Sequence, residues 1–213
     1  MIKIPERFGF YAVLTNPLKG YEYITNLLVE MGFPFVQLRM KDSTEAQVEQ
    51  TAQKMKKITE GTQTKLIIND LAEVAARVGA DGLHIGQDDI SYEKAREIVG
   101  AHCIIGISTH SPSQTIEACK LNPDYIGIGP VFPTPTKKNP DPVIGIEGMK
   151  AMLAVATVPA VCIGGIDLNN LPEVLRAGAE NFCMVRQFTQ SQDPKKVLEE
   201  MQGIYSNVFP SVT

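Results

Sequence analysis

A proline-rich stretch, residues 128–138, carries two hydroxyl groups and a lysine directly after a short apolar run. Its sequence is Ile-Gly-Pro-Val-Phe-Pro-Thr-Pro-Thr-Lys-Lys, so Thr134, Thr136 and Lys137 are close neighbours. Hydroxyl donors beside a fixed positive charge suit anionic oxygens, above all those of phosphate. An ordinary surface loop could have the same composition. The phosphate interpretation gains weight because four other apolar runs also end in polar residues.

The apolar run 35–39 leads into a cationic segment. Gln37, Arg39 and Lys41 occupy alternate positions, so an extended strand would direct all three to one side. Two like charges on one side are unfavourable in a core but useful around a diphosphate. The segment therefore predicts a diphosphate site, with an amphipathic sheet edge as the alternative.

Carboxylates follow the next two apolar runs. Asn69 and Asp70 end one run, and Gly86-Gln87-Asp88-Asp89 follows the other. Magnesium binds one or two carboxylates and completes its shell with water and substrate phosphates. We therefore expect Asp70 and Asp89 to bind Mg²⁺ opposite the cationic segment. The alternative is that both aspartates cap the helices that follow them.

Three further positions complete the candidate set. Ser108 follows the apolar run 103–107, and Gly164-Gly165 precedes a predicted helix. Glycines at such a place allow a phosphate to approach the backbone N–H groups of a helix N-terminus. His84 lies inside an apolar run and is interpreted as a structural histidine.

Apolar runs of strand length alternate with segments of helical periodicity. The predicted strands are 10–15, 35–39, 65–68, 82–85, 103–107, 124–129, 159–163 and 181–185. The predicted helices are 20–31, 44–59, 71–78, 91–99, 112–120, 146–155, 168–177 and 193–204. This alternation predicts a single-domain (β/α)8 TIM barrel over residues 1–213, with a doubly wound open sheet as the alternative. In a barrel, the strand ends meet at one face, which would gather the polar residues described above.

Composition limits the classes of protein that fit. The chain has 213 residues, of which 44% are hydrophobic and 21% charged, as expected of one globular domain. A net charge of -4 argues against a nucleic-acid partner. The four cysteines are widely spaced, and we expect buried thiols in a reducing cytoplasm. Neither a signal peptide nor a membrane-length apolar run is evident, so no membrane association is expected.

Read together, the polar segments resemble the thiamine-phosphate synthase (thiamine-phosphate pyrophosphorylase) family. They follow the order and spacing of that family from roughly residue 10 to residue 190. The matching segments are Gln37-Leu-Arg-x-Lys41, Ile68-Asn-Asp70, Ala80 to Asp89, Gly106-Ile-Ser-Thr-His110, Asp124 to Lys137 and Ile163-Gly-Gly-Ile166. The resemblance implies condensation of a hydroxymethylpyrimidine diphosphate with a thiazole phosphate, giving thiamine phosphate and pyrophosphate.

The resemblance also implies roles for individual residues. The pyrimidine diphosphate would be held by Gln37, Arg39, Lys41, Asn69, Ser108 and Lys137. The catalytic residues among these would be Arg39, Lys41, Ser108 and Lys137. Mg²⁺ would be the cofactor, bound by Asp70 and Asp89. The thiazole phosphate would be held by Thr134, Thr136, Gly165, Val185 and Arg186. The implied partners are these small phosphorylated substrates, and homo-oligomer formation is left open.

The chain departs from the family pattern at the end of the last predicted strand. Val185-Arg186 stands where the family usually has an aliphatic residue and a serine. One hypothesis is that Arg186 clamps the thiazole phosphate through its guanidinium fork. The other is that its side chain fills part of the thiazole pocket. Thr15-Asn16-Pro17, where an acidic residue often follows the threonine, is a second departure.

Other functions fit parts of the same pattern. A thiazole tautomerase would share the fold, and His110 lies where that branch can place a catalytic histidine. A non-catalytic sensor of thiazole phosphate is suggested only by Arg186. A sugar-phosphate isomerase or epimerase would require an acid–base pair across the barrel mouth, and Asp70 and Asp89 could fill that role. The Gln-Leu-Arg-x-Lys cluster would then have no purpose.

Overall fold

The computed structural model describes residues 4–134 and 141–210. Its strands form a single eight-stranded parallel sheet in the order β1 to β8. The strands are β1 Tyr11–Leu14, β2 Phe35–Leu38, β3 Lys65–Asn69, β4 Gly82–Ile85, β5 Ile104–Thr109, β6 Tyr125–Ile128, β7 Ala160–Cys162 and β8 Asn181–Phe182. A parallel bridge between Phe10 and Phe182 joins the last strand to the residues before the first, and this closes a barrel.

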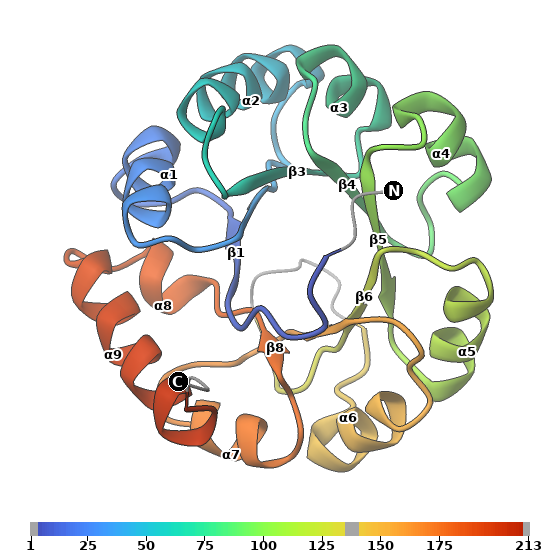
Figure 1. Ribbon diagram of the computed structural model, residues 1–213, viewed down its shortest axis with the longest axis vertical. Coiled ribbons are helices and arrows are strands. Elements are labelled where there is room, and N and C mark those ends of the chain that lie inside the picture. Colours follow the sequence, from blue (N-terminus) through green and yellow to red (C-terminus); the bar gives the residue numbers. More distant parts are fainter. Residues whose placement is uncertain (1–3, 135–140, 211–213) are drawn as a thin grey trace.

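Helices surround the barrel as an outer ring (Figure 1). They are α1 Tyr21–Glu30, α2 Glu45–Thr59, α3 Ala72–Val78, α4 Tyr92–Val99, α5 Pro112–Lys120, α6 Gly145–Leu153, α7 Leu171–Arg176, α8 Arg186–Thr189 and α9 Pro194–Val208. The prediction of a (β/α)8 TIM barrel is therefore confirmed, and the open sheet is excluded. Within the described residues, no helix has the length and apolar character needed to cross a membrane.

Apolar side chains fill two layers. One cluster packs between the strands and the surrounding helices and includes Leu14, Val36, Leu66 and Ile126. A smaller cluster fills the barrel interior with residues such as Tyr11, Phe35, Ile67 and Ile104, together with Ile4 from the N-terminal segment. Strands buried on both faces require nearly continuous apolar sequence, which explains why the strand positions were predictable.

One side chain supports the seam between β8 and the start of the chain, next to the bridge at Phe10 and a backbone hydrogen bond from Phe182 N–H to the Gly9 oxygen. The Asn181 carboxamide oxygen accepts hydrogen bonds from the backbone N–H groups of Phe8 and Gly9, at 2.6 and 3.0 Å. Its amide nitrogen donates to the backbone oxygen of Glu6 at 2.8 Å. β8 contains only two residues, so these bonds supplement a short ladder.

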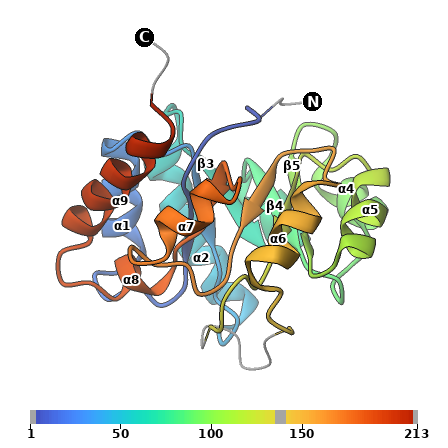
Figure 2. The same cartoon turned by 90° about the horizontal axis from the view of Figure 1, so that it is seen from below.

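The predicted boundaries were wrong in the last third of the chain. Helix α7 begins at Leu171 rather than at residue 168, because the Asp167 carboxylate accepts from Asn169 and Asn170 N–H groups and holds a turn there. Strand β8 ends at Phe182 rather than at residue 185. The short helix α8 was not predicted. It starts directly after Val185, and Figure 2 shows it on the face opposite the two termini.

Candidate active site

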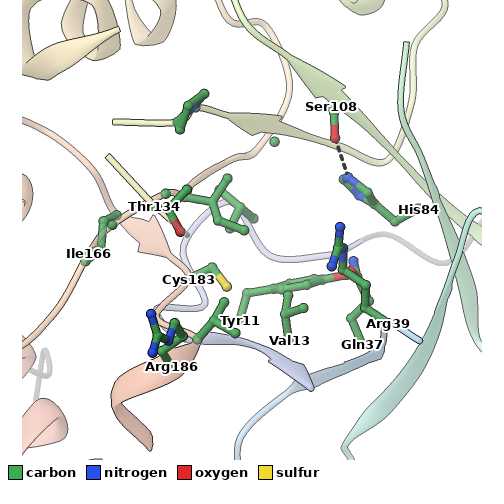
Figure 3. A pocket seen from close by; sticks show the side chains of 18 of the residues that line it. Tyr11, Val13, Gln37, Arg39, His84, Ser108, Thr134, Ile166, Cys183 and Arg186 are labelled. Atoms are coloured by element: carbon green, nitrogen blue, oxygen red, sulfur yellow. Dashed lines mark hydrogen bonds between the residues drawn. The ribbon is translucent and has the colours of Figure 1, made fainter. Parts of the chain in front are cut away.

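A cavity of about 540 Å³ opens at the carboxyl ends of the strands. Of the residues predicted for the site, eight line it: Gln37, Arg39, Asn69, Ser108, Thr134, Gly165, Val185 and Arg186. Lys41, Asp70 and Asp89 are not among the lining residues and lie in the loops after β2, β3 and β4. The lining residue Arg39 shares the first of these loops, and the lining residue Asn69 directly precedes the second. Thr136 and Lys137 lie outside the described residues. In Figure 3, Arg39 and Gln37 lie on one side of the cavity, and Thr134, Ile166 and Arg186 lie on the other.

The part of the site formed by the ends of β2, β3 and β4 is here called the β2–β4 side. It is defined by Arg39, Lys41, Asn69, Asp70 and Asp89. Here the predicted cations and carboxylates lie against one another. Lys41 forms an ion pair with Asp70, and the charge of Asp70 also acts on the half-buried Arg39. Burial lowers the pKa of Arg39, and the two carboxylates of Asp70 and Asp42 oppose this change. Opposite charges therefore stabilise one another on this side before any ligand binds.

Asp70 has an unusual backbone conformation, with φ at 64°. This left-handed region is uncommon outside glycine, although aspartate and asparagine tolerate it best. Asp70 N–H donates to the backbone oxygen of His84 at 2.8 Å, which anchors the turn to the end of β4. Such strain is characteristic of functional sites, where the surrounding structure maintains it.

The two carboxyl groups of Asp70 and Asp89 interact directly. Burial and the hydrogen bond with Asp89 together raise the pKa of Asp70 to about 6, against the opposing effect of Lys41. The pKa of Asp89 is lowered: burial opposes this, but the hydrogen bonds from Asp70 and from the Gly86 N–H outweigh it. Two carboxyls that share one proton form a site that a divalent cation can occupy in place of that proton. The residues present therefore fit Mg²⁺.

Neither aspartate acts as a helix cap, which was the alternative interpretation. Leu71 occupies the N-cap position of α3, with no side-chain cap hydrogen bond. Ser91 caps α4 by accepting from Lys94 N–H. Asp89 instead accepts from the Gly86 N–H at 2.7 Å. In the described part of the chain, no group of three or more His, Cys, Asp or Glu residues could hold a metal ion. A pair of carboxylates relies on water and phosphate oxygens for the remaining ligands.

A line of hydrogen bonds crosses the barrel interior along the wall of the cavity, and most of it was not predicted from the sequence. Gln37 Nε2 donates to the Tyr11 hydroxyl at 3.0 Å, and the Tyr11 and Tyr125 hydroxyls are 2.6 Å apart. The Tyr125 hydroxyl is 2.9 Å from His84 Nδ1, and His84 Nε2 is 2.9 Å from Ser108 Oγ. We call these five residues the polar chain. His84 has both nitrogens satisfied, as expected of a structural histidine, yet it also lines the cavity.

The β6–β8 side, defined by Thr134, Gly165, Val185 and Arg186, is constructed mainly from backbone. Gly165 has φ at +62°, and a Cβ there would lie 2.6 Å from the Pro133 oxygen. Phe132 N–H donates to the Gly164 oxygen at 2.9 Å, which draws the loop after β6 onto the loop after β7. The glycines therefore permit the close approach of two loops. The sequence had suggested a different reason for them, the approach of a phosphate to a helix N-terminus.

Arg186 is the cationic residue of the β6–β8 side. Its guanidinium group makes no hydrogen bond or ion pair with the described residues, while Figure 3 shows its side chain beside the cavity near Cys183. Asn16, the second departure, has φ at 45°, a conformation that asparagine tolerates. Its backbone oxygen accepts from Gln190 Nε2 at 2.8 Å, so the β1 loop is held against the end of α8.

His110, considered for the tautomerase alternative, also lines the cavity. Its Nδ1 faces the backbone oxygen of Gly129, and its Nε2 lies 3.4 Å from the Asp141 carboxylate. Both ring nitrogens thus face oxygen atoms of the loop after β6.

A closed barrel with polar residues around a cavity at the carboxyl ends of its strands has the architecture of a TIM-barrel enzyme. Because this fold supports many chemistries, similarity to known proteins must decide among them. Residues 11–188 match the family model for thiamine monophosphate synthase. The chain belongs to that family.

Individual relatives agree with this assignment. A thiamine-phosphate synthase of Dictyoglomus thermophilum is 40% identical over 184 residues, which cover 84% of this chain and 82% of that protein. One from Pyrococcus abyssi is 34% identical over 96% of this chain and 98% of that protein. The solved thiamine phosphate pyrophosphorylase of Pyrococcus furiosus superimposes with a TM-score of 0.85 at 29% identity, covering 95% of this chain and 97% of that one.

Proposed function

We propose that this protein joins a hydroxymethylpyrimidine diphosphate to a thiazole phosphate in a Mg²⁺-dependent reaction that releases pyrophosphate. The observation that carries the proposal is the division of one cavity into two sides suited to anions. The β2–β4 side combines two cations with a pair of carboxylates, whereas the β6–β8 side presents a guanidinium group and backbone. Two phosphorylated substrates can thus be held with their reactive rings between the two sides.

The β2–β4 side would stabilise the charge that develops on the leaving pyrophosphate. The carbon attached to the electron-rich aminopyrimidine loses pyrophosphate and becomes a stabilised cation. Arg39 and Lys41 would bind the departing oxygens by preorganised electrostatics, and Lys137 would join them. Asp70 and Asp89 would hold Mg²⁺, which supplies further neutralisation of the diphosphate when bound. Asn69 and Ser108 would orient the same substrate by hydrogen bonding.

The cavity walls between the two sides are largely apolar. Val13, Val161 and Ile163 contribute to the lining. Apolar walls exclude water, which would otherwise react with the cation before the thiazole nitrogen does. Holding that nitrogen next to the cationic carbon supplies the proximity contribution to catalysis, and no nucleophilic side chain is required.

The β6–β8 side would bind the thiazole phosphate. Of the two hypotheses for Arg186, we favour the phosphate clamp, because the guanidinium lines the cavity without an ionic partner among the described residues. Backbone N–H groups around Gly165 and Val185 would complete the contacts, together with the hydroxyls of Thr134 and Thr136.

We place the enzyme in the cytoplasm, since the described cysteines are free and two of them, Cys162 and Cys183, are buried inside the barrel wall. Free thiols are usual in a reducing compartment.

The test is to incubate purified protein with the pyrimidine diphosphate, thiazole phosphate and Mg²⁺ and to measure thiamine phosphate and pyrophosphate together. We expect both products in equal amounts, and none after Mg²⁺ is removed with a chelator. If thiazole phosphate binds but neither product forms, the synthase proposal fails and the tautomerase and sensor functions lead.

A further inference from the structure

The polar chain has a direction, and the direction follows from its first bond. Gln37 Nε2 donates to the Tyr11 hydroxyl, and the assignment that gives the Tyr11 proton an acceptor has it donate to Tyr125, 2.6 Å away. The assignment that continues this direction has Tyr125 donating to His84 Nδ1, with the ring proton of His84 on Nε2, where it donates to Ser108 Oγ. Ser108 is thereby left with its own hydroxyl proton to offer to the cavity.

Each link carries a single proton because both phenols are neutral. Burial raises the pKa of Tyr11 and the pKa of Tyr125 well above the ordinary value for tyrosine. A neutral phenol has one proton to donate, so a reversal at one end of the chain must pass through every member. Gln37, Tyr11 and Tyr125 are respectively 4%, 2% and 1% exposed, so the first three members are shielded from solvent water.

The barrel provides space for this arrangement. A Cβ on Gly106 would lie 2.1 Å from Cζ of Tyr125, so only glycine at that position of β5 allows the Tyr125 ring to cross the interior. The ring of Tyr125 then lies against His84, with centroids 5.5 Å apart. The glycine and the tyrosine, on neighbouring strands, together create the middle link of the chain.

We propose that the polar chain couples the orientation of the Gln37 amide to the polarity of the Ser108 hydroxyl, and that this coupling selects a 4-aminopyrimidine over a 4-oxopyrimidine. The inference rests on the proposed function. In the observed orientation, Gln37 Oε1 has no hydrogen-bond donor among the described residues, and Gln37 lines the cavity. A carbonyl oxygen at this position accepts from an amino group of the substrate.

A 4-oxo substrate requires the opposite orientation. The Gln37 amide must turn so that Nε2 meets the oxo group, and Oε1 then accepts from Tyr11. Every later bond reverses, the ring proton of His84 moves to Nδ1, and Ser108 must donate to His84 Nε2. Ser108 consequently presents only lone pairs to the cavity, where the diphosphate oxygens are also acceptors. One wrong atom on the substrate ring therefore removes a favourable contact at a second, distant residue.

The direct test replaces Gln37 with an acceptor that cannot donate. A Gln37→Glu carboxylate accepts from Tyr11 and forces the reversed direction without any substrate. The chain contains three histidines, so ¹⁵N NMR can assign the tautomer of His84 with His102→Gln and His110→Gln variants as references. At about pH 8 we expect the proton on Nε2 in the parent protein and on Nδ1 in the Gln37→Glu variant.

Two further variants control this experiment. Tyr125→Phe removes the middle hydroxyl, so we expect both tautomers of His84 to appear, and adding Gln37→Glu should change nothing more. Tyr205→Phe, which removes a hydroxyl bonded to the Glu180 backbone oxygen, should leave the tautomer unchanged. An unaltered tautomer in both Gln37→Glu and Tyr125→Phe, or a doubly protonated His84 in the parent, would overturn the proposal.

The substrate arm compares kcat/KM for the 4-amino and 4-oxo pyrimidine diphosphates. We expect the parent to prefer the amino compound by at least about 100-fold, and Tyr125→Phe to reduce this preference about tenfold. An unchanged preference in Tyr125→Phe would refute the selection. If neither compound is a substrate of the parent, the proposed function fails. The tautomer measurement still decides whether the polar chain couples the Gln37 amide to the Ser108 hydroxyl.

Discussion

On the β2–β4 side, cations and carboxylates neutralise one another through Lys41, Asp70 and their neighbours. On the β6–β8 side, Arg186 has no ionic partner among the described residues, and the wall consists of glycine and loop backbone. The difference matches the ligands we propose. A site of mixed charge would suit a diphosphate accompanied by Mg²⁺, because the leaving group must also depart from it. A phosphate that remains on the product requires only one binding cation, which Arg186 would provide.

The largest effect should come from breaking the mixed-charge side. Asp89→Asn removes one of the two carboxylates, so we expect kcat/KM to fall about 100- to 1,000-fold and the Mg²⁺ concentration for half-maximal rate to rise. Asp88→Asn, an exposed neighbour, is the matched control. Steady-state assays across a Mg²⁺ titration provide the measurement. Equal losses in the two variants would mean that Asp89 has no specific role.

A second prediction concerns the guanidinium of the other side. Arg186→Ser should weaken thiazole-phosphate binding about 10- to 100-fold, because hydrogen bonds to charged groups contribute more than neutral ones. Calorimetric titration measures this affinity, with the exposed Arg176→Ser in α7 as control. Tighter binding would instead support the hypothesis that the side chain fills the thiazole pocket, and unchanged affinity would rule out both hypotheses.

The third prediction tests whether the β6–β8 side depends on backbone. Gly165→Ala places a Cβ 2.7 Å from the Phe132 Cβ at a φ of +62°. We expect a loss of about 1–3 kcal/mol in the free energy of unfolding, together with weaker thiazole-phosphate binding. Gly203→Ala in α9, where nothing lies within 4 Å of a new Cβ, should cause no loss. Denaturant unfolding of both variants compares them, and equal stability would contradict the packing argument.

The smallest effect concerns pH. The pKa of Asp70 is raised from 3.8 to about 6 in the metal-free protein, so the folded state binds this proton more tightly than the unfolded state. The stabilisation from Asp70 alone would be about 3 kcal/mol, present below about pH 4 and lost as pH rises through about 6. The lowered pKa of the neighbouring Asp89 contributes the opposite change, so we expect a net loss of about 1 kcal/mol. Thermal unfolding in a chelator should show this decrease, and Asp70→Asn should flatten it. A rise in stability over the same range would contradict the assignment.

The sequence was most informative where chemistry and periodicity coincide. Gln37, Arg39 and Asn69 were predicted at strand ends and do line one cavity, because a parallel barrel gathers those ends at one face. The pairing of Asp70 with Asp89 was likewise predictable from two consecutive strand ends. Local pattern was sufficient for these positions, because the end of each strand can be recognised from its own sequence and the barrel then brings the strand ends together.

Other features depend on contacts distant in sequence and were not predictable from local pattern. Tyr11 and Tyr125 lie inside apolar runs and look like ordinary core residues, although their hydroxyls meet across 114 positions of the chain. Helix α8 is only four residues long, too short to give a helical period. Gly106 lies inside one apolar run and Tyr125 in the next, so a glycine within a predicted strand could have suggested that an aromatic ring from the neighbouring strand crosses over it.

The seam at Asn181 joins the two ends of the chain, so the ring can close only after the last strand has been synthesised. Its side chain bonds residues 6, 8 and 9, about 170 positions earlier, and the two-residue strand β8 adds little ladder of its own. On the ribosome, a nascent chain that has reached β7 is an open arc with two unpaired edges, one of them at β1. β8 pairs with β7 and bridges to Phe10, so its arrival removes both edges at once. The last strand to be synthesised thus protects the first one from pairing with other chains.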